Sequence, residues 1–218
     1  MKKERVSIIG GADGPTSVFL LGGKGKISIR NRIERRIRKI RRYFIEKKIT
    51  CENHSLEEVE TYLLQKYDFV KVSPEAVKTS EEYRQMRAAF IEQYAPELLG
   101  EYAVRPQMKG RDPEDIKTFM RLCEERTARA MELPESVFDI DMCKYEKIIN
   151  SNKNNKCTMD ITIEKKYSYI GGGASGSKRY VKEYGKIYKD IHRYYGVTET
   201  DVKQNSDRYQ KLIHVLSL

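Results

Sequence analysis

Apolar residues recur at helical spacing along most of this chain and alternate at strand spacing in only a few segments. Between Arg30 and Ile49, isoleucines fall every three or four residues, which predicts one amphipathic helix whose apolar stripe faces the protein core. Ser55 and Glu58 have the S-x-x-E spacing of a capping box and predict a second helix over residues 56–67. Asp112, followed by proline, predicts the start of another helix in the middle of the chain.

The strand signals lie near the two ends of the chain. Residues 5–29 hold short β-branched runs between glycine clusters, a pattern that predicts a β-hairpin. Residues 158–164 alternate, with Met159, Ile161 and Ile163 on one face, and they predict a half-buried strand. We interpret residues 137–149 as a further helix and the glycine-rich residues 170–178 as a flexible turn. The predicted fold class is therefore α+β and mostly helical, with an N-terminal β-hairpin, a helical body and one late strand.

A polar loop over residues 150–156 is the best candidate for a domain boundary. It divides the chain into a hairpin with a basic helix (1–49), a helical body (50–150) and a strand with C-terminal helices (157–218). One continuous domain is the alternative, because a chain of 218 residues is within the range of a single domain.

The composition limits the location and the chemistry of the protein. The longest run without a polar side chain has six residues, whereas a membrane helix needs about twenty, so we expect no membrane span. The apolar stretch after the charged N-terminus is interrupted, and we therefore expect no secretory leader and a cytoplasmic location. The four cysteines have no paired spacing and the three histidines do not cluster, which predicts reduced thiols and no metal site. No catalytic motif is present, so we predict neither enzymatic activity nor a cofactor.

The strongest chemical signal is the charge of the helix predicted after residue 29. Ten basic and two acidic residues fall between Arg30 and Lys48, a net charge of +8 within a chain whose total is +10. Like charges along one helix repel each other, so this helix favours an anionic partner. The residues predicted to bind that partner are Arg30, Arg32, Arg35, Arg36, Arg38, Lys39, Arg41 and Arg42.

Phosphate is the anion that an arginine-rich helix suits best, because guanidinium groups contact it in a bidentate manner. Nucleic acid, either DNA or RNA, or a ribonucleoprotein is therefore the leading expected partner. The protein would then be a non-enzymatic binding protein that acts as an accessory factor or as an inhibitor occupying a charged groove. An acidic protein surface, or an acidic face of the chain itself, is the main alternative. An anionic membrane surface and a plainly solvated helix are two further alternatives.

A glycine-rich motif near the N-terminus carries a separate signal. The segment from Ile8 to Leu20 contains G-G-A-D-G-P-T-S and resembles a segment of the β subunit of sodium-translocating decarboxylase pumps. That resemblance implies a part in sodium binding and ion transport, with Asp13 as the matching carboxylate. It covers thirteen residues, and the rest of the chain lacks the many spans of a pump, so we expect neither decarboxylase nor pump activity. The motif is also similar to that of small soluble bacterial proteins which share only this N-terminal signature.

Two interpretations of the glycine-rich loop stay open from its residues. Asp13, Gly14 and the proline after them can form a tight hairpin turn. Alternatively, the loop can bind a small ligand, because glycines allow successive N–H groups to converge on one anion or ligand oxygen. Sodium is the ligand that the resemblance implies, with the Asp13 carboxylate as its partner. The residues of that ligand loop would be Gly10, Gly11, Asp13 and Gly14.

Overall fold

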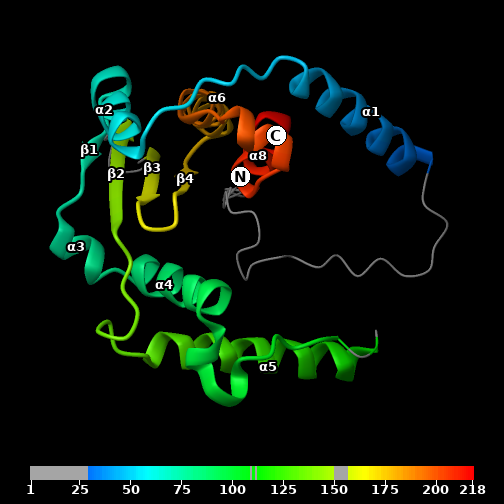
Figure 1. The fold of residues 1–218 in the computed structure, drawn as a ribbon, viewed down its shortest axis with the longest axis vertical. Coiled ribbons are helices and arrows are strands. Elements are labelled where there is room, and N and C mark those ends of the chain that lie inside the picture. The colour runs from blue at the N-terminus through cyan, green and yellow to red at the C-terminus, as the bar shows by residue number, and fades with distance from the viewer. Residues whose placement is uncertain (1–28, 109, 111, 150–156) are drawn as a thin grey trace.

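The computed structural model describes residues 29–108, 110, 112–149 and 157–218, drawn as ribbons in Figure 1. The helices of these residues are α1 (Ile29–Glu46), α2 (Leu56–Tyr67), α3 (Pro74–Lys78), α4 (Glu81–Tyr94), the 3-10 helix η1 (Pro96–Tyr102), α5 (Pro113–Glu132), α6 (Lys178–Tyr195), α7 (Glu199–Gln204) and α8 (Asp207–Ser217). The strands are β1 (Val70–Lys71), β2 (Met142–Ile149), β3 (Cys157–Glu164) and β4 (Tyr169–Ser175). The fold class is thus α+β and mostly helical, as predicted, while the hairpin predicted before residue 29 lies outside the described residues.

The helices begin where the capping residues of the sequence place them. The Ser55 hydroxyl accepts a hydrogen bond from the Glu58 N–H at 3.2 Å, and the Glu58 carboxylate accepts one from the Ser55 N–H at 2.7 Å. This reciprocal pair satisfies two donors that a helix N-terminus leaves free, so the predicted capping box is confirmed. The Asp112 carboxylate accepts from the Asp115 N–H at 2.8 Å and starts α5 in the same way.

The four strands form one antiparallel sheet in the order β1-β2-β3-β4. In its register Tyr145 lies opposite Ile161, and Ile161 lies opposite Gly172. Because side chains alternate along a strand, one face of the sheet is apolar and the other presents Lys144, Glu146, Asp160 and similar polar groups. The alternation predicted for residues 158–164 is confirmed, since Met159, Ile161 and Ile163 are all buried on the apolar face.

Two local predictions are wrong, and both corrections add strands. Residues 142–149 form β2 rather than the end of a helix, since Cys143 and Tyr145 alternate with charged residues at a period of two. Residues 169–175 form β4 rather than a flexible turn. A Cβ on Gly172 would lie 2.3 Å from the Asp160 carbonyl oxygen and 2.6 Å from the Tyr184 hydroxyl, so glycine is needed here for close packing. The late part of the chain therefore contributes three strands instead of one.

Helices α2 and α6 cover the apolar face of the sheet and form the main core with it. Its fully buried side chains include Leu63 of α2, Tyr145 and Ile161 of the sheet, and Tyr184 and Ile191 of α6. A second part of the core joins α4, α5 and η1, and α5 lies at the opposite end of the molecule from α1 (Figure 1). Within the described ranges, no helix is both long enough and apolar enough to cross a bilayer.

The buried guanidinium group of Arg87 ties α4 to the segment that follows α5. Arg87 is 4% exposed, and its Nε donates to the Phe138 carbonyl at 2.6 Å. Its Nη2 donates to the carbonyl oxygens of Leu133 at 2.7 Å and Pro134 at 2.6 Å. A buried carbonyl without a donor is costly, so one side chain satisfies three groups that have no place in a helix or sheet.

Replacing Arg87 should therefore be strongly destabilising. We expect Arg87→Leu, which keeps an apolar stem but no donors, to lower the free energy of unfolding by about 3 kcal/mol in urea denaturation at neutral pH. The matched control is Arg84→Leu, one turn away on the exposed face of α4, which should cost less than about 1 kcal/mol. Equal losses in the two variants would contradict the bridging role of Arg87.

Candidate nucleic-acid interface

The basic helix α1 is attached to the rest of the molecule through α8, near the C-terminus of the chain. Arg41 Nη1 donates to the Ser217 carbonyl at 3.2 Å, and Arg42 Nη2 donates to Gln210 Oε1 at 3.0 Å. The first contact places a cation at the carbonyl end of α8, where the helix dipole favours positive charge. Both contacts lie in the second half of α1, so this half fixes the helix to the body.

All eight cations predicted to bind a partner belong to α1. Arg30, Arg32, Arg35 and Arg38 are placed by the backbone of the helix alone. The side chains of the other four, which are Arg36, Lys39, Arg41 and Arg42, are exposed. Arg42 forms an ion pair with Glu46 at 2.7 Å, whereas Arg36, Lys39 and Arg41 have no ion pair with any residue that the structure describes. The described carboxylates therefore leave three of these four described side chains without an ion pair.

The structure adds a second basic helix, α6, which the sequence analysis did not identify as a binding element. Its cations are Lys178, Arg179, Lys182, Lys186, Lys189 and Arg193. One of its two acidic residues, Asp190, is already engaged, because it accepts hydrogen bonds from Tyr62 at 2.6 Å and Tyr67 at 2.7 Å and pairs with Lys66 at 2.9 Å. The outer face of α6 is therefore strongly positive.

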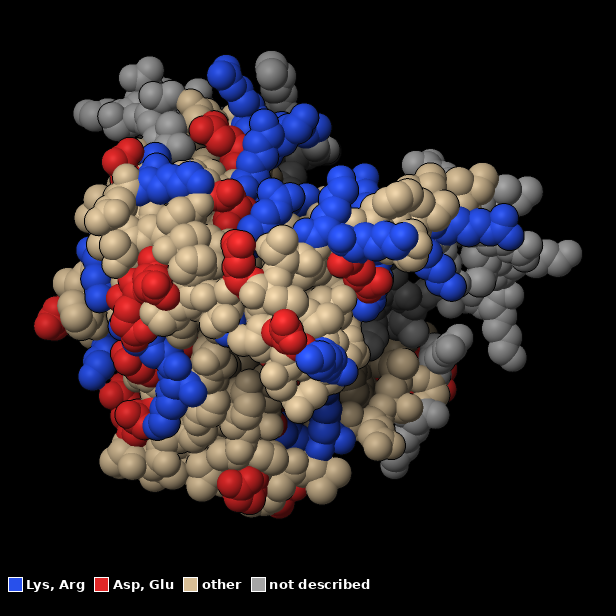
Figure 2. Space-filling view, turned by 45° about the horizontal axis from the view of Figure 1, so that its top comes forward, with Lys and Arg blue, Asp and Glu red and all other residues tan. Residues whose placement is uncertain are grey.

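Cations of α1 and α6 come close enough to influence one another. Burial lowers the pKa of Lys189, and the neighbouring charges of Arg41 and Arg193 lower it further. No described carboxylate pairs with any of these three residues. Figure 2 shows Lys and Arg side chains gathered from the top of the view along its right-hand side, where α1 lies. We call this surface of α1 and α6 the cationic surface.

The spacing of the α6 cations could have revealed this surface. Lys182, Lys186, Lys189 and Arg193 recur at steps of three and four residues, which places them on one side of a helix. Their proximity to α1, however, joins segments more than a hundred residues apart, and a single sequence gives no sign of it.

The apolar stripe of α1 does not face the core, contrary to the sequence-based expectation. Ile33, Ile37, Ile40 and Phe44 are each more than half exposed. The reason is that α1 packs on α8 through its second half and presents its stripe outside that contact. An exposed apolar patch of this kind is typical of an interaction site.

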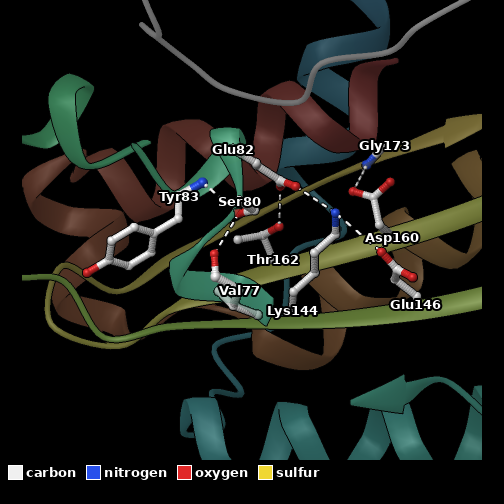
Figure 3. Close-up of polar contacts among 9 residues, drawn as sticks. All are labelled: Val77, Ser80, Glu82, Tyr83, Lys144, Glu146, Asp160, Thr162 and Gly173. Carbon is white, nitrogen blue, oxygen red and sulfur yellow. Dashed lines mark hydrogen bonds and ion pairs between the residues drawn. The ribbon is translucent and has the colours of Figure 1, made fainter. Parts of the chain in front are cut away.

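A second polar cluster lies on the face of the sheet opposite to the main core (Figure 3). Lys144 Nζ lies 2.6 Å from a Glu82 carboxylate oxygen and 3.4 Å from one of Glu146. The Thr162 hydroxyl donates to the other Glu82 oxygen at 2.9 Å. Asp160 accepts a hydrogen bond from the Gly173 N–H at 3.0 Å. The cluster links the start of α4 to β2 and β3.

The contacts of this polar cluster are sufficient to explain it as a structural link between α4 and the sheet. Burial raises the pKa of the Asp160 carboxyl to about 6, an effect that the nearby Lys144 ammonium opposes. Its lysine and its other carboxylates have partners within the cluster, and the Thr162 hydroxyl is engaged by Glu82. In the part of the chain that the structure describes, no three His, Cys, Asp or Glu side chains form a group suited to a metal ion.

The ligand loop predicted from Gly10, Gly11, Asp13 and Gly14 lies outside the described residues. Comparison of the chain with known protein families, with curated proteins and with solved structures gave no match. The case for function therefore depends on the chemistry of the described surfaces.

The raised pKa of Asp160 gives a prediction with a defined sign. The Asp160 carboxyl binds a proton near pH 6 in the folded protein but only near pH 3.8 in the unfolded chain. Protonation of Asp160 therefore favours the folded state, and this contribution to stability is full below pH 3.8 and is lost as pH rises through 6. Asp160→Asn should therefore raise the free energy of unfolding by about 1–2 kcal/mol at pH 7.5, and the gain should shrink toward zero at pH 4. Urea denaturation at the two pH values measures it.

Glu146→Gln is the matched control for Asp160→Asn, because its side chain is 44% exposed in the same cluster. We expect it to change stability by less than about 0.5 kcal/mol at either pH. Destabilisation by Asp160→Asn at pH 7.5 would show instead that the ionised carboxylate is favourable beside Lys144.

Proposed function

We propose that this protein is a non-enzymatic binding protein that engages nucleic acid or a ribonucleoprotein through the cationic surface of α1 and α6. The observation that carries the proposal is that Lys189 of α6 lies within electrostatic range of both Arg41 of α1 and Arg193, while none of the three pairs with a described carboxylate. Such crowding costs free energy in the isolated protein. A polyanion removes that cost, because its phosphates replace the repulsion with attraction and release bound counterions.

The composition of the surface favours phosphate over other anions. Arginine predominates in α1, and its planar guanidinium group contacts two phosphate oxygens at once or stacks on a base. Helices α1 and α6, whose cations Arg41 and Lys189 lie within electrostatic range of each other, present a wider positive area than α1 alone. An acidic protein surface is the alternative partner, and competition by RNA for the same surface separates the two.

Charge reversal on both helices should weaken binding in a salt-dependent manner. We expect Arg36→Glu combined with Arg193→Glu to lower affinity for mixed-sequence RNA or duplex DNA by more than about tenfold. The slope of log K against log salt should fall by about two, because two phosphate contacts are lost. Fluorescence anisotropy with labelled oligonucleotides between about 50 and 200 mM salt measures both quantities.

The control for this experiment reverses the same number of charges elsewhere. Lys78 and Lys117 are exposed on α3 and α5, away from α1. Lys78→Glu combined with Lys117→Glu should retain affinity within about threefold, since it changes the net charge equally but spares the cationic surface. Equal losses in the two double variants would contradict a defined interface, and salt-independent binding would contradict phosphate contacts.

An anionic membrane surface is a second candidate partner, and the exposed stripe of α1 favours it. A basic amphipathic helix lies in the membrane interface with its apolar side chains among the acyl chains and its cations at the headgroups. Ile33, Ile37, Ile40 and Phe44 are exposed on a helix that also carries the exposed Arg36 and Lys39. Nucleic acid needs the cations of α1 but has no use for this stripe.

Flotation with phosphatidylserine vesicles distinguishes the two candidates. If the membrane is the partner, the protein floats with the vesicles and Ile37→Ser combined with Phe44→Ser abolishes flotation, because the apolar anchor is lost. RNA affinity should stay unchanged in that variant. Val104→Ser combined with Met120→Ser, at two exposed apolar positions outside α1, is the control. Failure of the unaltered protein to float rejects the membrane candidate.

A further inference from the structure

A small recess lies between α6, α8 and the segment around β4. Its volume is about 20 Å³, and its lining includes Ser168, Ile170, His192, Tyr195 and Lys211. Ser168, Tyr195 and Arg208 also line an adjoining open cavity of about 340 Å³ beside the start of α2. The recess thus adjoins the surface through a larger outer cavity.

Two nitrogen-bearing side chains meet in this recess without a polar partner among the described residues. His192 is 3% exposed, and its Nε2 has no hydrogen-bond partner. The Lys211 ammonium lies 3.7 Å from the centre of the Tyr169 ring and forms no ion pair with a described carboxylate. Buried polar atoms are almost always paired, so a buried imidazole nitrogen beside an unpaired ammonium indicates a missing partner.

The other groups around Lys211 make the recess a place for an anion. Arg208 of α8 is held by the carbonyl oxygens of Tyr195 at 2.6 Å and Gly196 at 2.8 Å, and it adds a permanent positive charge. Among the described residues, no carboxylate lines the recess. In the outer cavity, the Glu57 carboxylate forms an ion pair with Lys165 at 3.7 Å. A space of this volume holds about one water molecule or an ion of similar size.

We propose that this recess binds a small anion, which accepts hydrogen bonds from the Lys211 ammonium and from the Nε2–H tautomer of His192. The anionic group is either a free ion such as chloride or the carboxylate of an organic acid whose remainder occupies the outer cavity. This site shares no residue with the cationic surface. The two proposals can therefore fail independently.

Protonation of Lys211 sets the pH dependence of such a site. Burial lowers the pKa of Lys211 to about 7, whereas His192 stays neutral above a pKa of about 3 because of its burial. Tyr169 stays neutral, since burial raises its pKa to about 12, and the Arg208 guanidinium keeps its charge. Anion binding should therefore be strongest below pH 7 and should weaken by about tenfold for each pH unit above it.

The test compares melting temperatures in sodium chloride, sodium acetate and sodium sulfate of equal ionic strength, at pH 6 and pH 9. We expect chloride or acetate to raise the melting temperature above its value in sulfate at pH 6 but not at pH 9. A larger gain with acetate assigns the site to a carboxylate, and a larger gain with chloride assigns it to a free ion. Absence of any difference between the three salts at pH 6 overturns the proposal.

The decisive variant is Lys211→Met, which replaces a partly buried cation that has no described ion pair with an apolar chain of similar length. It should lose the anion-dependent gain while melting in sulfate no lower than the unaltered protein. Lys117→Met, an exposed control on α5, should keep the gain. A gain retained in Lys211→Met contradicts the assignment. If that variant does not fold, chloride-35 NMR on the unaltered protein decides, because line broadening that is equal at pH 6 and pH 9 overturns the proposal.

Discussion

Burial of one face of the antiparallel sheet under α6 is the interaction on which the arrangement of this molecule depends. Tyr145 and Ile161 point to the face where Tyr184 and Ile191 pack, and all four side chains are essentially inaccessible to water. Apolar burial of this extent outweighs the repulsion between surface charges. Since α6 is amphipathic, burying its tyrosines and isoleucines forces its lysines and arginines outward. The position of this positive charge on the surface is therefore partly a consequence of how the sheet is covered.

The buried charges Arg87 and Glu164 have hydrogen-bond partners, whereas several exposed cations of α1 and α6 have no described ion pair. Arg87 is fully occupied by carbonyl groups, and Glu164, which is 0% exposed, accepts hydrogen bonds from the N–H groups of Asp141 at 2.9 Å and Tyr167 at 2.6 Å. These charges hold irregular segments in place, as expected for ionised groups inside a protein. Against this background, the unpaired cations of the cationic surface and the unpaired nitrogens of the recess stand apart. Both proposals follow from that contrast: a polyanion on the cationic surface and a small anion in the recess.

Helix α1 carries two features, of which a nucleic acid would use only one. Its cations suit phosphate, and its exposed isoleucines suit an apolar environment, while its attachment to α8 leaves both accessible. The charges of α6 that lie within electrostatic range of α1 extend its positive surface, which strengthens the case for an extended polyanion. The exposed stripe is the one feature of α1 that this partner leaves unexplained, and it is the reason for keeping the membrane as a rival.

The sequence by itself determined the elements whose signals are local. Capping residues such as Ser55 and Asp112 fixed where helices start, the period of β3 fixed its two faces, and the charge of α1 is visible from composition. Only the tertiary structure decided that residues 142–149 extend beside β3, because a short segment can satisfy helix or strand and the partner strand settles the choice. It also decided that Lys189 lies within electrostatic range of Arg41, that Lys211 and His192 line the same recess, and that the stripe of α1 stays outside the core. Each of these depends on the packing of segments far apart in the chain, about which local spacing carries no information.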